Sequence, residues 1–151
     1  MKRTVVAAAA VIALGAVAGA AVAQVKPEVL VKQRQAGMTL ISKYFGPLGG
    51  MAQGKVPFNA QLVQRNADYL AVLSQTPWDG FDPSTANEKS RAKPELFKEM
   101  DKVKGLVERF QGEVKKLQTV AKGGDEAAIK SQIAAVGKAC GACHDPYREK
   151  Q

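Results

Sequence analysis

The stretch that decides the fold is PELFKEMDKVKGLVERFQGEVKKLQTVAKGG, residues 94–124. Its large apolar side chains recur at alternating steps of four and three residues, which is the period of an amphipathic α-helix. Proline suits the first turn of a helix, and the glycine pair at its end is a typical stop. The stretch therefore predicts one long helix with a single apolar face, made by Leu96, Met100, Val103, Val107, Phe110, Val114 and Leu117.

Three more amphipathic helices are predicted around this one. The first covers residues 27–45 and is ended by GPLGG, the second is capped by Asn59 and stopped by Pro77, and the last follows Asp125. Residues 78–93 are polar and punctuated by Gly and Pro, so they predict a long loop. The apolar stripes favour an all-α fold, an antiparallel four-helix bundle, in which cofactor sites lie between facing helices. The expected core-facing positions are Val31, Arg34, Met38, Ile41 and Phe45; Leu62, Val63, Tyr69, Leu70 and Leu73; and Ile129, Ile133, Val136, Cys140, Cys143 and Tyr147.

The first 23 residues have the pattern of a secretory signal peptide. Lys2 and Arg3 precede an apolar run rich in Ala, Val and Gly, and Ala21-Val22-Ala23 forms a cleavage site before Gln24. An uncleaved anchor is the alternative, since residues 4–23 are just long enough to span a bilayer. The weakly apolar composition and the cleavage pattern favour removal. We therefore expect residues 24–151 to form one exported domain that does not insert into the membrane.

The charge of the chain disfavours a nucleic-acid partner. The formal charge is +8 at pH 7, but Lys and Arg are dispersed among acidic residues. Dispersed charge is typical of solvated helix faces, whereas nucleic-acid binding is indicated by a dense basic cluster with interleaved aromatic residues.

The only two cysteines and the only histidine of the chain lie within five residues, at Cys140, Cys143 and His144. Their pattern, C-x-x-C-H, is that of c-type haem attachment. Thiols three residues apart on a helix face the same side, so both reach the vinyl groups of one porphyrin. The adjacent imidazole then reaches the iron as an axial ligand. The motif therefore predicts one covalently bound haem c.

Three other interpretations of the motif are weaker. A structural zinc site takes about four protein ligands, and the chain has no further Cys or His to complete one. A thioredoxin-like pair belongs at a helix start in an α/β pattern, whereas this pair lies late in a helix of an all-α chain. A disulfide between residues so close in sequence closes a tiny loop and stabilises little.

The opposite face of the iron carries a methionine, a weaker group or nothing, because His144 is the only histidine. Met38 lies on the predicted core face of the first helix, where packing alone is the commoner role of a methionine. Arg34 lies one turn earlier on that face. A guanidinium at a core position needs a paired anion, and a haem propionate fits this need. The alternative is that Arg34 extends to solvent at the end of the bundle.

Beyond its signal the chain resembles the class II c-type cytochromes, and especially cytochrome c′, over essentially its whole length. The resemblance is carried by KPEVLVKQRQAGMTL at 26–40, PW at 77–78, AKPELF at 92–97 and VGKACGACHDPYREK at 136–150. It implies a periplasmic four-helix bundle, commonly a homodimer, that holds one covalent haem near its C-terminus.

The resemblance also implies roles for single residues. Cys140 and Cys143 match the thioether positions, His144 the axial ligand, Arg34 and Gln35 the propionate-contacting pair, Met38 the distal position, Arg148 the basic residue beside the proximal histidine, and Arg91 a further propionate contact. Pro146 departs from the pattern. Because proline removes a backbone donor and clashes with the preceding turn, it predicts a kink or an early end of the last helix.

The resemblance implies two kinds of iron site. In cytochrome c′ the iron is five-coordinate, a bulky apolar residue covers its open face, and gases such as nitric oxide or carbon monoxide bind. In the low-spin class II proteins a methionine ligates the iron and raises its reduction potential, which suits pure electron transfer. The Arg-Gln pair before Met38 favours the five-coordinate form.

We therefore expect an electron-transfer protein that serves periplasmic redox partners and is able to bind small gases. The alternatives are a low-spin carrier with Met38 as sixth ligand and a dedicated nitric oxide binding protein. A haem enzyme such as a peroxidase is disfavoured, because it needs a distal acid–base group and the stripe around Met38 and Ile41 is apolar.

Overall fold

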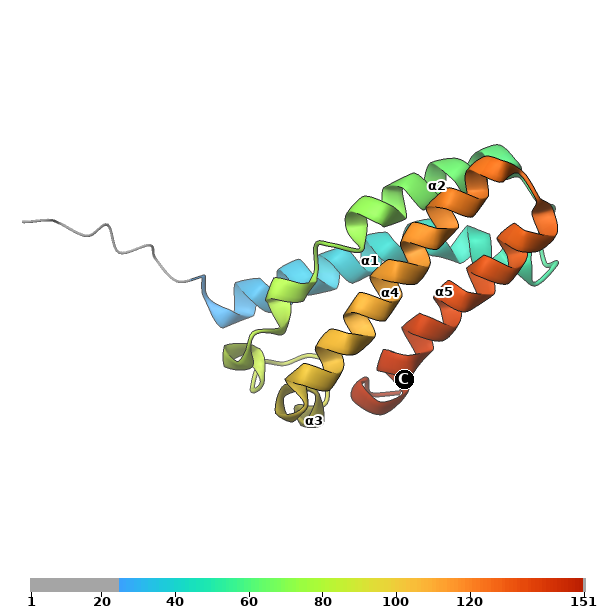
Figure 1. The fold of residues 1–151 in the computed structure, drawn as a ribbon. Helices are drawn as coiled ribbons and strands as arrows, with labels where there is room; N and C mark the ends of the chain where they lie inside the picture. Colours follow the sequence, from blue (N-terminus) through green and yellow to red (C-terminus); the bar gives the residue numbers. More distant parts are fainter. Residues whose placement is uncertain (1–24, 151) are drawn as a thin grey trace, which may run out of the picture.

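The structure, a computed structural model that describes residues 25–150, contains four long α-helices, one short α-helix and two short 3-10 helices (Figure 1). The long helices close into a bundle, because α1 and α4 each pack against both α2 and α5. This arrangement confirms the predicted all-α four-helix bundle. The signal peptide predicted for residues 1–23 lies outside the described residues. The helices are α1 (Pro27–Ala52), α2 (Ala60–Leu73), α3 (Pro94–Lys98), α4 (Met100–Gly123) and α5 (Glu126–Tyr147).

The core of the bundle is built mainly from the predicted apolar stripes. One residue of the α2 stripe departs from the prediction, because the Tyr69 side chain is 46% exposed, whereas Val63 and Leu70 are buried as expected. Asn66 and Ala67 are also buried. Asn66 Nδ2 donates a hydrogen bond of 3.0 Å to the Tyr44 carbonyl and so ties α2 to α1. The main core cluster contains Ile41, Leu48, Met51, Val63, Ala67, Leu70, Phe110, Val114, Leu117, Ala121, Ile129, Ile133, Val136 and Ala139.

The first helix is longer than predicted. It runs through the GPLGG segment and ends at Ala52, although Pro47 lies inside it. A proline in a helix interior costs about 3 kcal/mol. Leu48 and Met51 are buried in the core at 0% and 4% exposure, and burying two such side chains stabilises by roughly 3–6 kcal/mol. Tertiary packing therefore outweighs the local breaking signal.

The single helix predicted from residue 94 is interrupted at Glu99, which separates α3 from α4. Glu99 has φ −119° and ψ 38°, outside the helical region. Its carboxylate accepts hydrogen bonds from the Tyr147 hydroxyl and from Lys102 Nζ. Leu96 and Val103, on either side of the break, pack with the Tyr147 ring in a second, smaller cluster. The break is therefore stabilised by contact with the end of α5, which local periodicity does not reveal.

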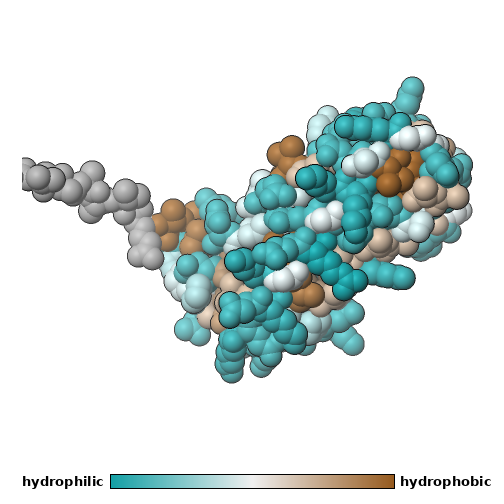
Figure 2. Space-filling model, viewed as in Figure 1, coloured by the Kyte–Doolittle hydropathy of each residue, from teal (hydrophilic) through white to brown (hydrophobic). Residues whose placement is uncertain are grey.

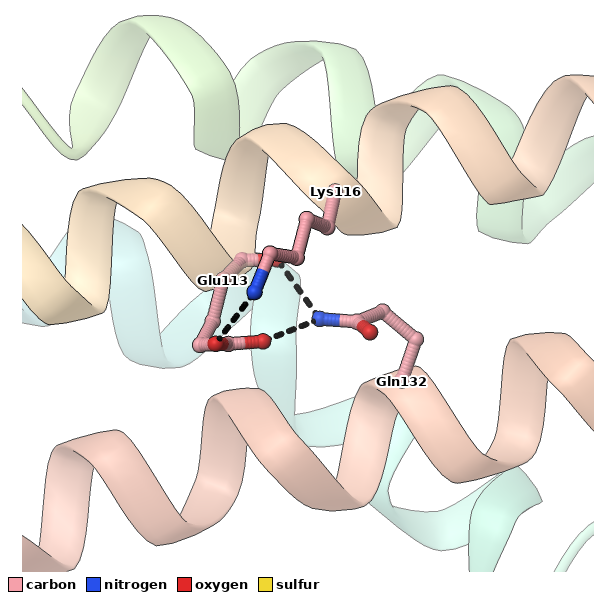
Figure 3. A network of polar contacts seen from close by, with 3 residues as sticks. All are labelled: Glu113, Lys116 and Gln132. Atoms are coloured by element: carbon pink, nitrogen blue, oxygen red, sulfur yellow. Dashed lines mark hydrogen bonds and ion pairs between the residues drawn. The ribbon is translucent and has the colours of Figure 1, made fainter.

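Polar contacts join α4 to α5 outside the core (Figure 3). Gln132 Nε2 donates to the Glu113 carbonyl at 3.0 Å and to Glu113 Oε2 at 2.6 Å, and Lys116 Nζ lies 3.0 Å from Oε1. Hydrogen bonds from Gln132 and then Lys116 hold the pKa of Glu113 below its usual value.

The face shown in Figure 2 is mainly hydrophilic with small, separate hydrophobic areas. Within residues 25–150 no helix is both long and apolar enough to cross a membrane.

Candidate haem site

A cavity of about 650 Å³ lies among α1, α4, α5 and the segment between α2 and α3. Its volume falls in the range of small-molecule and cofactor sites, roughly 300–1,000 Å³. Most of the lining is apolar or aromatic, so the cavity suits a flat, largely apolar group. The apolar and aromatic lining comprises Met38, Ile41, Phe45, Trp78, Phe81, Ala92, Leu96, Val103, Leu106, Val107, Phe110, Ala139 and Tyr147.

The last turns of α5 bring Cys140, Cys143 and His144 into the lining together. Both thiols are free and half-buried; Cys140 packs against the main core and Cys143 against the smaller cluster. Burial raises the pKa of both thiols. Burial, and then the charge of Arg148, lowers the pKa of His144. The imidazole is therefore held neutral, which is the form that ligates a metal.

Helix α1 contributes Gln35 and Met38 to the same cavity, about a hundred residues away from the cysteine pair in the sequence. Gln35 is exposed, whereas Met38 is half-buried and packs against the main core. The structure thus brings the predicted distal residue and the attachment motif into one cavity.

Arg34 also lines this cavity, but its hydrogen bonds differ from those expected. The side chain is 3% exposed, so the alternative that it extends to solvent is wrong. Its guanidinium donates to three neutral acceptors, Gly80 O at 2.7 Å, Thr85 Oγ1 at 2.7 Å and Ser90 Oγ at 2.8 Å. A paired anion is therefore not required to satisfy these N–H groups. Contact with a propionate stays a prediction.

Arg91 and Arg148 are exposed and line the edge of the cavity. The Arg91 guanidinium donates to the Glu149 carbonyl from Nη2 at 2.5 Å and from Nε at 3.1 Å. The backbones of Ala92 and Arg148 form an isolated antiparallel bridge. The C-terminal residues are thus tied to the segment before α3, and two of the predicted basic residues line the cavity together with His144.

Helix α5 ends one residue beyond Pro146, in agreement with the early end that this proline predicts. Tyr147 is 3% exposed, and its hydroxyl donates to Glu99. The Arg148 amide donates to the His144 carbonyl at 3.0 Å. These contacts give the end of the helix a defined place despite the missing proline donor.

Sequence reasoning missed the contribution of the predicted loop to the site. Trp78, Phe81 and Ser90 come from this segment and line the cavity. Trp78 and Phe81, two aromatic residues in the otherwise polar stretch 78–93, are the signal for this contribution, because large aromatic side chains are usually at least partly buried.

The residues of the cavity fit a covalent haem. Two free thiols and a neutral imidazole adjoin apolar walls that suit a porphyrin. Arginines at the edge suit its carboxylates. Among residues 25–150 no group of three or more His, Cys, Asp or Glu side chains is placed to hold a metal ion by itself.

The chain is similar to cytochromes c′ in sequence and in structure. The family model described as Cytochrome C' matches residues 29–148. Cytochrome c′ of Alcaligenes xylosoxydans xylosoxydans is 36% identical over 126 residues, which cover 83% of this chain and 98% of the relative. The solved structure of cytochrome c prime from Shewanella frigidimarina has a TM-score of 0.79 at 32% identity, covering 82% of this chain and 97% of that one. A nitric oxide complex of a mutant cytochrome c prime from Alcaligenes xylosoxidans has a TM-score of 0.75 at 36% identity, covering 83% and 98%.

Proposed function

The chain belongs to the cytochrome c′ family and binds one covalent haem c, and on this premise we propose that it is a periplasmic electron carrier with a five-coordinate iron that binds small gases. The observation that carries the proposal is the make-up of the cavity. His144, the only histidine of the sequence, lines the cavity from α5. Met38 lines it from α1 and packs against the main core. The nitric oxide complex of the related protein supports the choice of gas.

Cys140 and Cys143 would hold the haem through thioether bonds, and His144 would supply the axial nitrogen. When bound, the haem supplies the one-electron chemistry of its iron. The chain binds and orients it: burial keeps His144 neutral, and Ile41, Phe45 and their neighbours keep water away. An apolar pocket admits small uncharged molecules more readily than anions, which must lose their hydration.

The two candidate iron sites differ in the role of Met38. Packing against the main core supports a covering role, in which the methionine shields an open position. Its presence in the cavity lining also favours, as the second candidate, a low-spin carrier in which the Met38 sulfur is the sixth ligand.

The ferric absorption spectrum tests the choice, with Met38→Leu as the diagnostic variant. For the five-coordinate protein we expect a high-spin spectrum that Met38→Leu leaves high-spin, and nitric oxide binding to the reduced form. Met51→Leu is the matched control, since Met51 is buried in the core and does not line the cavity. A low-spin spectrum with a methionine–iron charge-transfer band that Met38→Leu abolishes would establish the second candidate instead.

We further propose that the protein is periplasmic, that its haem is attached to the motif on α5, that two chains form a homodimer, and that the protein is not an enzyme. We expect the mature protein in the periplasmic fraction, cut before Gln24, with the added mass of one haem on a peptide containing Cys140 and Cys143. Sedimentation should show a homodimer. Apart from His144, the lining among the described residues contains no His, Asp or Glu to act as an acid–base group, so peroxide turnover should not exceed that of free haem. A cytoplasmic protein, or one carrying zinc in place of haem, contradicts the proposal.

A further inference from the structure

Residues 78–92, the segment between α2 and α3, form one side of the haem cavity and contain little regular structure. The only helical elements of the segment are two short 3-10 helices, η1 (Trp78–Phe81) and η2 (Pro83–Thr85). Since few of its backbone groups bond to each other, the segment must be held in place by contacts with other elements. It contributes Trp78, Phe81, Ser90, Arg91 and Ala92 to the lining.

Arg34 supplies such contacts from α1. Nη1 donates to Gly80 O and to Thr85 Oγ1, and Nη2 donates to Ser90 Oγ. These acceptors lie 46, 51 and 56 residues away in the sequence. One guanidinium thus joins three separate points of the segment to α1 from two nitrogen atoms, an arrangement that the single nitrogen of a lysine ammonium does not reproduce.

Packing around Arg34 reinforces these bonds. The rings of Phe81 and Phe97 have their centres 5.0 and 5.7 Å from Arg34 Cζ, within the range of cation–π attraction. Gly80 lies so close to α1 that a Cβ there would be 2.5 Å from Arg34 Cβ and 2.7 Å from the Leu30 carbonyl oxygen. The backbone of the segment is therefore packed directly against α1, beside the Cβ atom of Arg34.

We propose that Arg34 is a positioning residue that holds segment 78–92 as a wall of the haem cavity and thereby fixes the charge of Arg91 beside His144. Ser90 immediately precedes Arg91, so the bond from Arg34 to Ser90 sets the point where Arg91 leaves the segment. On its other side, Arg91 is bonded to the Glu149 carbonyl. This role is separate from any contact between Arg34 and a propionate.

The second part of the inference rests on the proposed haem site. Arg91 lines the same cavity as His144 and Arg148, and the neighbouring Ala92 is paired with Arg148 through the backbone, so the charge of Arg91 lies on the proximal side of the cavity. A positive charge held there favours the reduced, less positive iron and raises the reduction potential. A displaced Arg91 is screened by solvent, so loosening the segment should lower the potential.

The first experiment measures the trypsin cleavage of the haem-loaded protein after Lys89 and Arg91. The key variant is Thr85→Val/Ser90→Ala, which removes two acceptors of Arg34 and keeps Arg34 itself. It also removes the bonds from Thr85 Oγ1 to Asp82 O and from the Ala92 amide to Ser90 Oγ, so the inference requires faster cleavage of Arg34→Lys as well, which leaves both of these bonds in place. We expect its cleavage to be about tenfold faster than that of the unchanged protein, since each lost bond to a charged donor favours local opening. Arg34→Lys should be cleaved at a similar rate, and Ser90→Ala alone at an intermediate rate, which keeps the test available if the double variant fails to fold.

Thr119→Val is the matched control. The Thr119 hydroxyl donates to the Lys115 carbonyl within α4, 3.2 Å away, and Thr119 neither lines the cavity nor bonds to the segment. Its removal should leave both the cleavage rate and the potential unchanged.

The second experiment measures reduction potentials. Thr85→Val/Ser90→Ala and Arg91→Gln should each lower the potential, and combining them should add little, because both act through the same charge. If the acceptor variant is cleaved no faster than the unchanged protein while Arg34→Lys still alters the potential, Arg34 acts only on the haem and the inference is wrong. Faster cleavage with an unchanged potential overturns the part that concerns Arg91. Ligation by Met38 would change the absolute potential, but the cleavage rates and the differences in potential between variants do not require a five-coordinate iron, so the proposed gas binding can fail without affecting this test.

Discussion

Replacing Gly80 by alanine tests the contact between α1 and the cavity wall most directly. The added Cβ would lie 2.5 Å from Arg34 Cβ and 2.7 Å from the Leu30 carbonyl oxygen, whereas non-bonded carbon atoms prefer about 3.5–4.0 Å. One of these atoms is backbone and the other is the first side-chain carbon, so neither moves without α1. The segment and the helix must therefore separate by about 1 Å.

The cost follows from the strain and from the bond that it breaks. Overpacking of this kind costs about 1–3 kcal/mol, and losing a hydrogen bond to a charged group costs about 1.5–3 kcal/mol. The bond at risk is the one from Arg34 Nη1 to Gly80 O, which is 2.7 Å long. We expect Gly80→Ala to lower the free energy of unfolding by about 3–5 kcal/mol.

Urea unfolding of the haem-loaded protein, followed by far-UV circular dichroism, measures this loss as a shift of the midpoint at constant slope. Gly112→Ala is the control, because a Cβ at Gly112 in α4 meets nothing within 4 Å. This change should raise stability by roughly 0.5–1 kcal/mol through helix propensity. A loss below about 1 kcal/mol for Gly80→Ala would refute the close packing of the segment on α1.

Three further predictions concern α5 and its attachment motif. Tyr147→Phe should lower stability at neutral pH, because hydrogen bonds from Tyr147 and then Lys102 hold the pKa of Glu99 below its usual value. That stabilisation is present above the unfolded-state pKa of Glu, about 4.3, and is lost as pH falls through the lower folded pKa, so unfolding curves of variant and unchanged protein should converge in acid. Asp125→Ala removes the acceptor of the Ala127 and Ala128 amides and should cost about 1 kcal/mol in the same unfolding assay; no loss would contradict the cap. Cys143→Ala should retain one haem through the remaining thioether, seen by mass spectrometry after acid extraction, whereas haem lost completely on extraction would show that Cys140 makes no bond.

The helices were predictable because their signals are local. Asn59 and Asp125 cap α2 and α5 as expected, since an N-cap bonds to amides two or three residues away. The apolar stripes also needed only a period of three to four residues. Two boundaries were predicted wrongly, at Pro47 and at Glu99, and in both cases buried contacts with distant residues outweigh the local preference.

The residues of the candidate site also differ in whether the local sequence reveals them. By itself, the sequence determined the attachment motif, because Cys140, Cys143 and His144 lie within five residues and face one side of a helix. Its resemblance to a family supplied Met38 as the distal residue. Only the tertiary structure decided that the polar loop is a wall of the cavity and that Arg34 bonds to Gly80, Thr85 and Ser90. The reason is physical: these partners lie 46 to 56 residues from Arg34 in the sequence, so their contact with it depends on how the helices pack and leaves no periodic pattern in the chain.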